Sequence, residues 1–549
     1  MSDYYDLGSY SRAVTTRSAE AQRWFDRGLL WCYGFNHDES VACYKRALEF
    51  DPDCAMAYWG IAYSSGCNYN KPWEAFDQED AQRSVTTAYD ATQEALSRRD
   101  NVSAFEKALI SALPYRYPVP APAEDMSPWN DDFANAMRKV YAEFSDDLEV
   151  ATLFGEAIMN RTPWALWDLT TGQIAAGANT AEAIEVLEKA LKLDGALEHP
   201  GLLHIYIHLM EMSPHPQRAL KASDALRSLV PDAGHLNHMP THIDVLCGHY
   251  ERVVSSNTAA IVADRKFLER EGPINFYSLY RCHDYHFKIY GAMFLGQYRP
   301  AIETAEEMIS TLPEALLQVE SPPMADWLEG FISMKQHVYI RFGKWQEIID
   351  QSLPENQGLY CVTTAMMHYS KAVALAASGN VPGAERQAEL FDEAMERVPG
   401  SRYVFNNTCL DILAVAREMM LGEIDYRNGE YESAFAHLGK SVKLDDNLPY
   451  DEPWGWMQPT RHALGALLLE QNRVEDAAEV YRADLGLDTT LSRACQHPDN
   501  VWSLHGYHEC LLRLDREGEA IIIKNRLDLA NGRTDVPVKS SCFCKLGSH

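Results

Sequence analysis

The sequence has no run of about 18 uninterrupted apolar residues, so we expect no membrane span. Its first residues, Met1 to Asp6, lack the basic start and the apolar stretch of a secretory signal peptide. The 12 cysteines are scattered along the chain, apart from the close pair Cys542 and Cys544. Scattered cysteines are typical of reduced, intracellular proteins. These absences together predict a cytoplasmic protein.

Positive charge is also scarce in this chain. The sequence carries 49 Lys and Arg against 79 Asp and Glu, which gives a net charge of −30 and a pI near 5.0. An excess of carboxylates repels phosphate and argues against nucleic acid as a partner. Hydrophobic residues at 46% and aromatic residues at 11% argue against disorder and can form a large core.

Large, small and proline residues recur at helical spacings. Trp24, Gly28, Tyr44, Ala47 and Pro52 fall at the places where a tetratricopeptide repeat (TPR) has such residues. A TPR unit consists of two antiparallel helices in 34 residues. Small residues let its helices approach, large ones fill the gap, and proline cannot continue a helix. Similar landmarks recur almost to residue 529, so the chain resembles a TPR protein over nearly its whole length.

The resemblance implies an all-α, TPR-like solenoid with a concave inner wall that can hold a peptide or a small molecule. We expect residues 1–20 to form an N-terminal extension, residues 21–530 a single superhelical domain, and residues 531–549 a tail. Two inserts interrupt the repeats, near 114–129 and 161–179. Because the first insert is rich in proline, we expect it to be non-helical.

Two histidine pairs are the main functional signal. His204 and His208 lie four residues apart, as do His238 and His242, and the second pair follows the first by 34 residues. A pair at this spacing shares one face of a helix. Pairs one repeat apart would lie on neighbouring parallel helices, so that four imidazoles can converge on a transition metal. Pro240 falls inside the second pair and predicts a helix that is kinked, rotated or late-starting.

TPR analogy places further histidines on the concave wall. Positions 2, 5 and 9 of each first helix face the groove, and nine of the 19 histidines take these positions. They are His204, His208, His235, His238, His242, His283, His286, His337 and His462. The simpler interpretation is that these are polar side chains on a wet groove wall.

We expect His204, His208, His238 and His242 to bind the metal. Glu211 or Glu156 would complete the coordination or transfer protons. Other side chains would support the ligands or contact the substrate, namely His235, His283, His286, Asn160, Tyr206, Arg461 and His462. Alternatively, Arg461 pairs with a local acid and the aromatic residues only pack helices. The H-E-x-x-H motif of zinc peptidases is absent, because Ile205 takes the glutamate position.

Three short runs carry a closer resemblance. Residues 203–211, 238–243 and 283–287 are similar to motifs of a largely uncharacterised TPR family of bacteria and fungi: H-x-x-I-H, H-M-P-S-H-I and H-N-x-H-F. This chain has Thr241 for the usual serine and Asp284 for the usual asparagine. The resemblance implies a shared site without indicating a reaction.

The sequence therefore predicts a metal-dependent enzyme that acts on a small organic substrate in the groove. Imidazole ligands suit copper, iron or zinc. We favour oxidation by iron or copper over hydrolysis or a lyase reaction by zinc. The alternative is a non-catalytic TPR scaffold that binds a protein or peptide, and the TPR surface could also support a homodimer. A third hypothesis is metal storage or delivery through Cys542 and Cys544.

Overall fold

The computed structural model describes residues 4–545, and it confirms the predicted all-α class. The sequence predicts one superhelical domain over residues 21–530, whereas the chain divides into two compact units. Unit 1 comprises Met1–Ile243 and Ala259–Glu271, and unit 2 comprises Asp244–Thr258 and Gly272–His549. No helix in the described residues is long and apolar enough to cross a membrane.

Short antiparallel helices form almost all of unit 1. They are α1 (Ala19–Tyr33), α2 (His37–Phe50), α3 (Ala55–Ser65), α4 (Gln78–Arg98), α5 (Ala104–Arg116), α6 (Ser127–Glu143), α7 (Leu148–Met159), α8 (Thr180–Ala190), α9 (Pro200–Glu211), α10 (Leu220–Leu226), α11 (Gly234–His238) and α12 (Pro240–Leu246). Both α12 and α13 (Tyr250–Glu271) contribute residues to both units.

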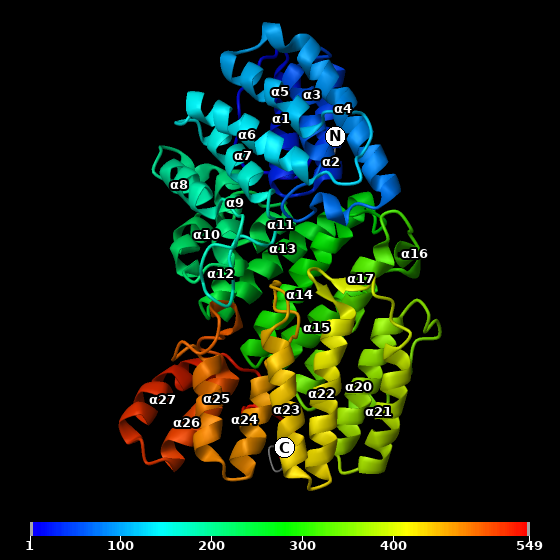
Figure 1. Cartoon of the computed structure of the whole chain (residues 1–549), viewed down its shortest axis with the longest axis vertical. Helices are drawn as coiled ribbons and strands as arrows, with labels where there is room; N and C mark the ends of the chain where they lie inside the picture. Colours follow the sequence, from blue (N-terminus) through cyan, green and yellow to red (C-terminus); the bar gives the residue numbers. More distant parts are fainter. Residues whose placement is uncertain (1–3, 546–549) are drawn as a thin grey trace. The chain divides into compact units, whose positions relative to one another are not determined.

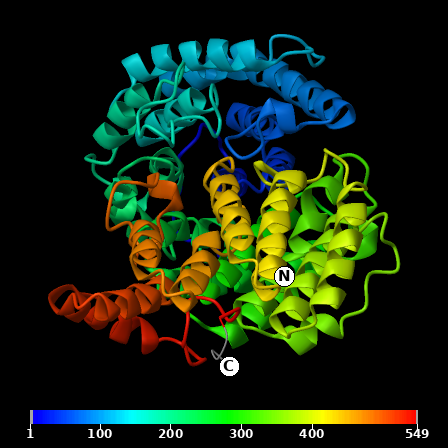
Figure 2. The ribbon, with the colours of Figure 1, turned by 60° about the horizontal axis from the view of Figure 1, so that its bottom comes forward.

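Unit 2 contains longer helix pairs and one short hairpin, β1 (Tyr403–Val404) with β2 (Asn407–Thr408). Its helices are α14 (Ser278–Phe294), α15 (Tyr298–Ser310), α16 (Glu314–Leu317), α17 (Met324–Ile332), α18 (Met334–Arg341), α19 (Trp345–Ile349), α20 (Cys361–Ala377), α21 (Val381–Met395), α22 (Cys409–Arg427), α23 (Tyr431–Asp446), α24 (Thr460–Glu470), α25 (Val474–Asp484), α26 (Val501–Arg513) and α27 (Glu517–Asn531). The pairs α20–α21 and α22–α23 stand side by side (Figures 1 and 2).

The packing that joins successive helices is of the TPR kind. The ring of Tyr44 on α2 lies between Gly28 on α1 and Gly60 on α3, where an added Cβ would come within 2.7 Å and 2.4 Å of the ring. Tyr481 on α25 lies in the same way between glycines of α24 and α26. A large residue thus fills the space that small residues leave between three consecutive helices. This confirms the TPR-like solenoid architecture within each unit.

The proline-rich insert is shorter than predicted. Helix α5 continues through Pro114 to Arg116, and α6 begins at Ser127 with Pro128 in its first turn. Only residues 117–126 of the expected 114–129 insert lie outside helices. The prediction was wrong at both ends because a first turn accepts proline without loss, and a helix end loses only one hydrogen bond to it. Residues 161–179, the second insert, contain no helix.

Pro240 has the effect that the sequence predicts. Helix α11 ends at His238, Met239 follows, and α12 begins at Pro240. A proline at the first helical position loses no intrahelical hydrogen bond, since that N–H would be unsatisfied in any case. The chain therefore changes direction between His238 and His242, and the two histidines lie on different helices.

Candidate metal centre

Five imidazoles form a closed circuit in the interior of unit 1. Their ring centroids are 4.7–5.6 Å apart in the order His204, His208, His242, His238, His235 and back to His204. All five side chains are at most 1% exposed. They come from α9, α11 and α12, so the predicted convergence of the two pairs is present within this unit.

His204, His208 and His235 each present a ring nitrogen within 4.8 Å of the others. Nitrogens around one tetrahedral zinc ion, at Zn–N distances of about 2.0–2.1 Å, lie about 3.3 Å apart. Small side-chain rotations therefore suffice to bring these three nitrogens to a common ion. His235, which the sequence placed outside the ligand set, belongs to this group.

Glu211 orients two of the rings. The Nδ1–H group of His208 donates to Glu211 Oε1 at 2.9 Å, and that of His242 donates to Glu211 Oε2 at 2.8 Å. Since each Nδ1 then carries the proton, each Nε2 of a neutral ring presents a lone pair. A carboxylate that holds the far nitrogen of a histidine in this way is a common support of metal-binding histidines.

The carbonyl of Tyr33 orients a third ring. His204 Nδ1 donates to this oxygen at 2.6 Å. Tyr33 is the last residue of α1, and the last carbonyls of a helix have no partner within it. Nε2 of His204 and Nε2 of His208 are both buried and make no hydrogen bond within the part of the chain that the structure describes. Two lone pairs thus face the interior of the cluster without a partner.

His238 and His242 approach each other most closely. Their Nε2 atoms are 2.7 Å apart, so one nitrogen donates a proton to the other. Because His242 already carries its proton on Nδ1, His238 is the donor in this contact. A metal that bound both nitrogens would displace this proton, which couples metal binding to proton release.

The interior of unit 1 keeps the cluster uncharged. Burial, followed by the charge of His242, lowers the pKa of His204 to about 3, and burial lowers that of His242 to about 3. Burial and the neighbouring imidazoles also hold the pKa values of His208 and His235 well below 6.5. The four rings are therefore neutral at physiological pH, which is the state that binds metal.

Aromatic side chains cover the cluster. The Phe35 ring lies 4.5 Å from His204 and 5.6 Å from His235, and Tyr69 lies 5.0 Å from His208. Trp164, in the second insert, lies 6.0 Å from His208. Sequence reasoning missed Tyr33, Phe35 and Tyr69. The packing of Phe35 against His204, His208 and His235 has no local sequence signal.

Three other predicted residues of unit 1 have separate environments. Glu156 accepts a 2.6 Å hydrogen bond from Tyr63, and burial raises its pKa. Asn160 caps α7, and its carbonyl accepts from Asn130 at 2.9 Å. The Tyr206 hydroxyl donates to Glu188 at 2.9 Å. Glu156 belongs to no group of convergent His, Cys, Asp or Glu ligand atoms within residues 4–545.

The remaining predicted residues belong to unit 2. The His283 ring packs on Phe405 at 4.7 Å, and His286 Nε2 lies 2.7 Å from Met457 Sδ. Arg461 forms a bidentate ion pair with Asp446, as the simpler interpretation expected. His462 accepts from Arg341 at Nδ1 (2.8 Å) and donates from Nε2 to Asp484 (3.1 Å).

Several solved structures align with this chain at low identity and low TM-score. The structure titled APC/C hetero-tetramer Cut9–Hcn1 is 13% identical over 86% of this chain and 74% of its own, with a TM-score of 0.31. Yeast Tom70 is 13% identical over 92% and 98%, with a TM-score of 0.30. The P58(IPK) TPR domain is 14% identical over 77% and 100%, with a TM-score of 0.18.

No protein-family model and no curated protein matches the sequence. The resemblance to the family with histidine motifs therefore stays a prediction. At TM-scores this low, the packing of Tyr44 and Tyr481 between their glycines carries the fold assignment. The chain is an all-α, TPR-like protein, and unit 1 encloses a group of buried histidines that could hold a metal ion.

Proposed function

We propose that unit 1 binds a transition-metal ion and that this chain uses the ion to act on a small organic molecule. The supporting observation is the pair of buried, unpartnered Nε2 atoms on His204 and His208. Hydrogen bonds to Tyr33 and Glu211 hold both rings in the tautomer that exposes Nε2 to the cluster. His235, His238 and His242 supply the remaining ligands.

The donor set limits which metals fit. Neutral imidazoles suit zinc, copper and iron, whereas magnesium and calcium prefer oxygen ligands. Glu211 adds one negative charge next to the ligands, which offsets part of the charge of the ion. With copper or iron the site would support oxidation by oxygen, and with zinc it would activate water. The proposal that the chain is an enzyme depends only on the chemistry that the bound metal would supply.

The second candidate function is a scaffold that binds a protein partner. It is favoured by the antiparallel helix pairs that make up both units, because stacked TPR pairs present extended binding surfaces. A measurement of substrate turnover distinguishes the enzyme from the scaffold. Metal-dependent oxygen consumption or hydrolysis would support the enzyme, whereas full metal content without turnover would favour a scaffold or a storage protein.

A Glu211→Gln substitution tests the metal centre. An amide can accept from only one of the two Nδ1–H groups, so its NH₂ group forces the other ring into the opposite tautomer. We expect metal affinity to fall about 10–100-fold. The measurement is competition with a chromophoric chelator for Zn²⁺ and for copper, on protein purified without an affinity tag.

Glu156→Gln is the matched control, because Glu156 is a buried glutamate of the same unit that contacts Tyr63 and no cluster histidine in the described structure. We expect this variant to bind metal as the wild type does. Equal affinity in Glu211→Gln and the wild type would show that Glu211 does not orient the ligands and would count against the centre.

A further inference from the structure

Residues 540–544 lie across unit 2 in the manner of a bound peptide. Arg341 donates from Nη2 to the carbonyl of Ser541, and Arg427 donates from Nη2 to the carbonyl of Cys544. The Ser541 hydroxyl donates to the carbonyl of His462 at 2.7 Å. Two guanidinium groups, each at least nine-tenths buried, thus hold the main chain at carbonyls three residues apart.

The side chains of this segment pack closely against residues of unit 2. Phe543 lies against Gly343, where an added Cβ would come 2.9 Å from the Phe543 Cβ, and its ring is 6.2 Å from that of Trp502. Cys544, joined to Cys542 by a disulfide, enters a buried cluster with Leu438. We call the surface of unit 2 that residues 540–544 contact, with Arg341, Arg427 and Gly343, the track. Its contacts with Ser541 and Phe543 fit a hydroxyl residue followed two places later by an aromatic residue.

The resident segment leaves three donors unsatisfied. Arg341 Nε, Arg427 Nη1 and Trp345 Nε1 are buried and have no hydrogen-bond acceptor among residues 4–545. Glu423 meets only the Nε group of Arg427, at 2.7 Å. A buried donor without an acceptor destabilises the folded protein. The track is therefore matched to a ligand with acceptor oxygens that residues 540–544 do not provide.

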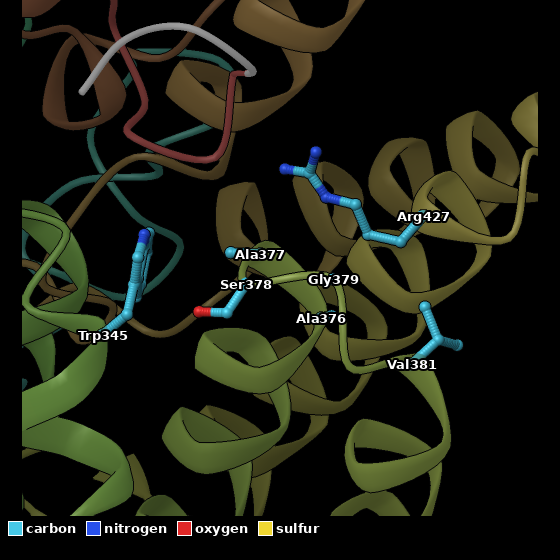
Figure 3. A pocket seen from close by; sticks show the side chains of 7 residues that line it. All are labelled: Trp345, Ala376, Ala377, Ser378, Gly379, Val381 and Arg427. Atoms are coloured by element: carbon cyan, nitrogen blue, oxygen red, sulfur yellow. The ribbon is translucent and has the colours of Figure 1, made fainter.

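A pocket of about 560 Å³ adjoins the end of the track. Trp345 and Arg427 lie on opposite sides of it, with Ser378 and Gly379 between them on the turn from α20 to α21 (Figure 3). The residue after Cys544 is Lys545, whose amine is 3.2 Å from Glu509. The chain itself thus places a cation immediately after the carbonyl that Arg427 holds.

We propose that unit 2 carries a peptide-binding site and that residues 540–544 fill it as a tethered, imperfect ligand. Its occupant in function is a turn of a partner protein with the pattern Ser-x-Phe-x-Asp or Ser-x-Phe-x-Glu, folded like residues 542–545, where the Lys545 N–H donates to the carbonyl of Cys542. The serine and phenylalanine repeat the contacts of Ser541 and Phe543. The acid stands in the place of Lys545, gives up the ion pair with Glu509 and accepts from the Nη1 group of Arg427, whose Nη2 already holds the preceding carbonyl. This site is independent of the metal centre in unit 1.

Peptide binding to the full chain tests the proposal. The protein carries Phe543→Ala, which loosens its own segment, and the probe is a fluorescent, disulfide-closed peptide with the sequence of residues 538–545. Fluorescence anisotropy should show at least tenfold tighter binding to this variant than to the wild type. A peptide with Lys545→Asp should bind the variant about tenfold more tightly still, since a charged hydrogen bond to the buried Arg427 outweighs the lost, partly exposed ion pair with Glu509.

One matched control is a substitution on α22, the helix that carries Arg427, and the other is a substitution in the peptide probe. Adding Arg427→Met to the protein should abolish binding, whereas adding Arg417→Met should not, since Arg417 on α22 pairs with Asp392. A peptide with Phe543→Ala should bind at least tenfold more weakly than the unchanged peptide. This comparison uses the same protein for both peptides, so it does not depend on how well a further protein variant folds. No binding of any peptide to the Phe543→Ala protein, or equal affinity for the Lys545→Asp peptide, would overturn the proposal.

Discussion

Replacing His204 and His208 together by leucine is expected to lower the metal affinity of this chain by about a hundredfold or more. Loss of a hydrogen bond that only supports a ligand already costs about 10–100-fold, and this variant removes two ligands. Leucine is close to histidine in volume, so the cluster remains filled. Elemental analysis and chelator competition on untagged protein measure the effect.

The control is a second histidine pair replaced in the same way. His505 and His508 lie three residues apart on α26 of unit 2, and both are partly exposed. Their replacement by leucine should leave metal content and affinity unchanged. If the His204→Leu/His208→Leu protein kept full metal content, or if the α26 variant lost it, the assignment of the metal to unit 1 would be wrong.

Acid should destabilise the metal-free protein steeply. The folded pKa values of His204 and His242 are about 3, and those of His208 and His235 are also depressed, whereas unfolded histidines titrate near 6.5. Below pH 6.5 the unfolded chain therefore gains protons that the folded chain refuses, and stability falls as pH falls. Above pH 6.5 these rings have no effect.

Each ring contributes a slope of up to about 1.4 kcal/mol per pH unit between pH 6.5 and its folded pKa. Chemical unfolding between pH 7.5 and 5, with a chelator present, measures the total slope. The His204→Leu/His208→Leu protein should lose about 3 kcal/mol per pH unit of it, because two rings are gone. An unchanged slope would mean that the two rings protonate freely in the folded state.

The parts of the centre that the sequence predicted are local in the chain. The i, i+4 spacing of His204 and His208 sets their common face on α9, and Pro240 sets the break before α12. Helical geometry fixes both within a few residues. The same rules identified the helix pairs, because the large and small residues that join them recur along the sequence.

The parts that were missed depend on contacts between distant segments. The carbonyl of Tyr33 meets His204 across 171 residues, and Arg341 meets Ser541 across 200. Backbone carbonyls have no signature in a sequence, so neither contact could be predicted. The sequence could not show how near His235 lies to the ligand set for a related reason, since its distance from His204 depends on how α11 packs against α9.

The most direct test is a crystal structure of the metal-loaded full chain with anomalous diffraction at the absorption edge of the bound metal. The account predicts one strong peak inside unit 1, about 2.0–2.1 Å from Nε2 of both His204 and His208 for zinc. It also predicts that Glu211 keeps its contacts to the Nδ1 atoms of His208 and His242. A peak bound only by surface histidines or by Cys542 and Cys544, with the five imidazoles of unit 1 free of metal, would contradict it.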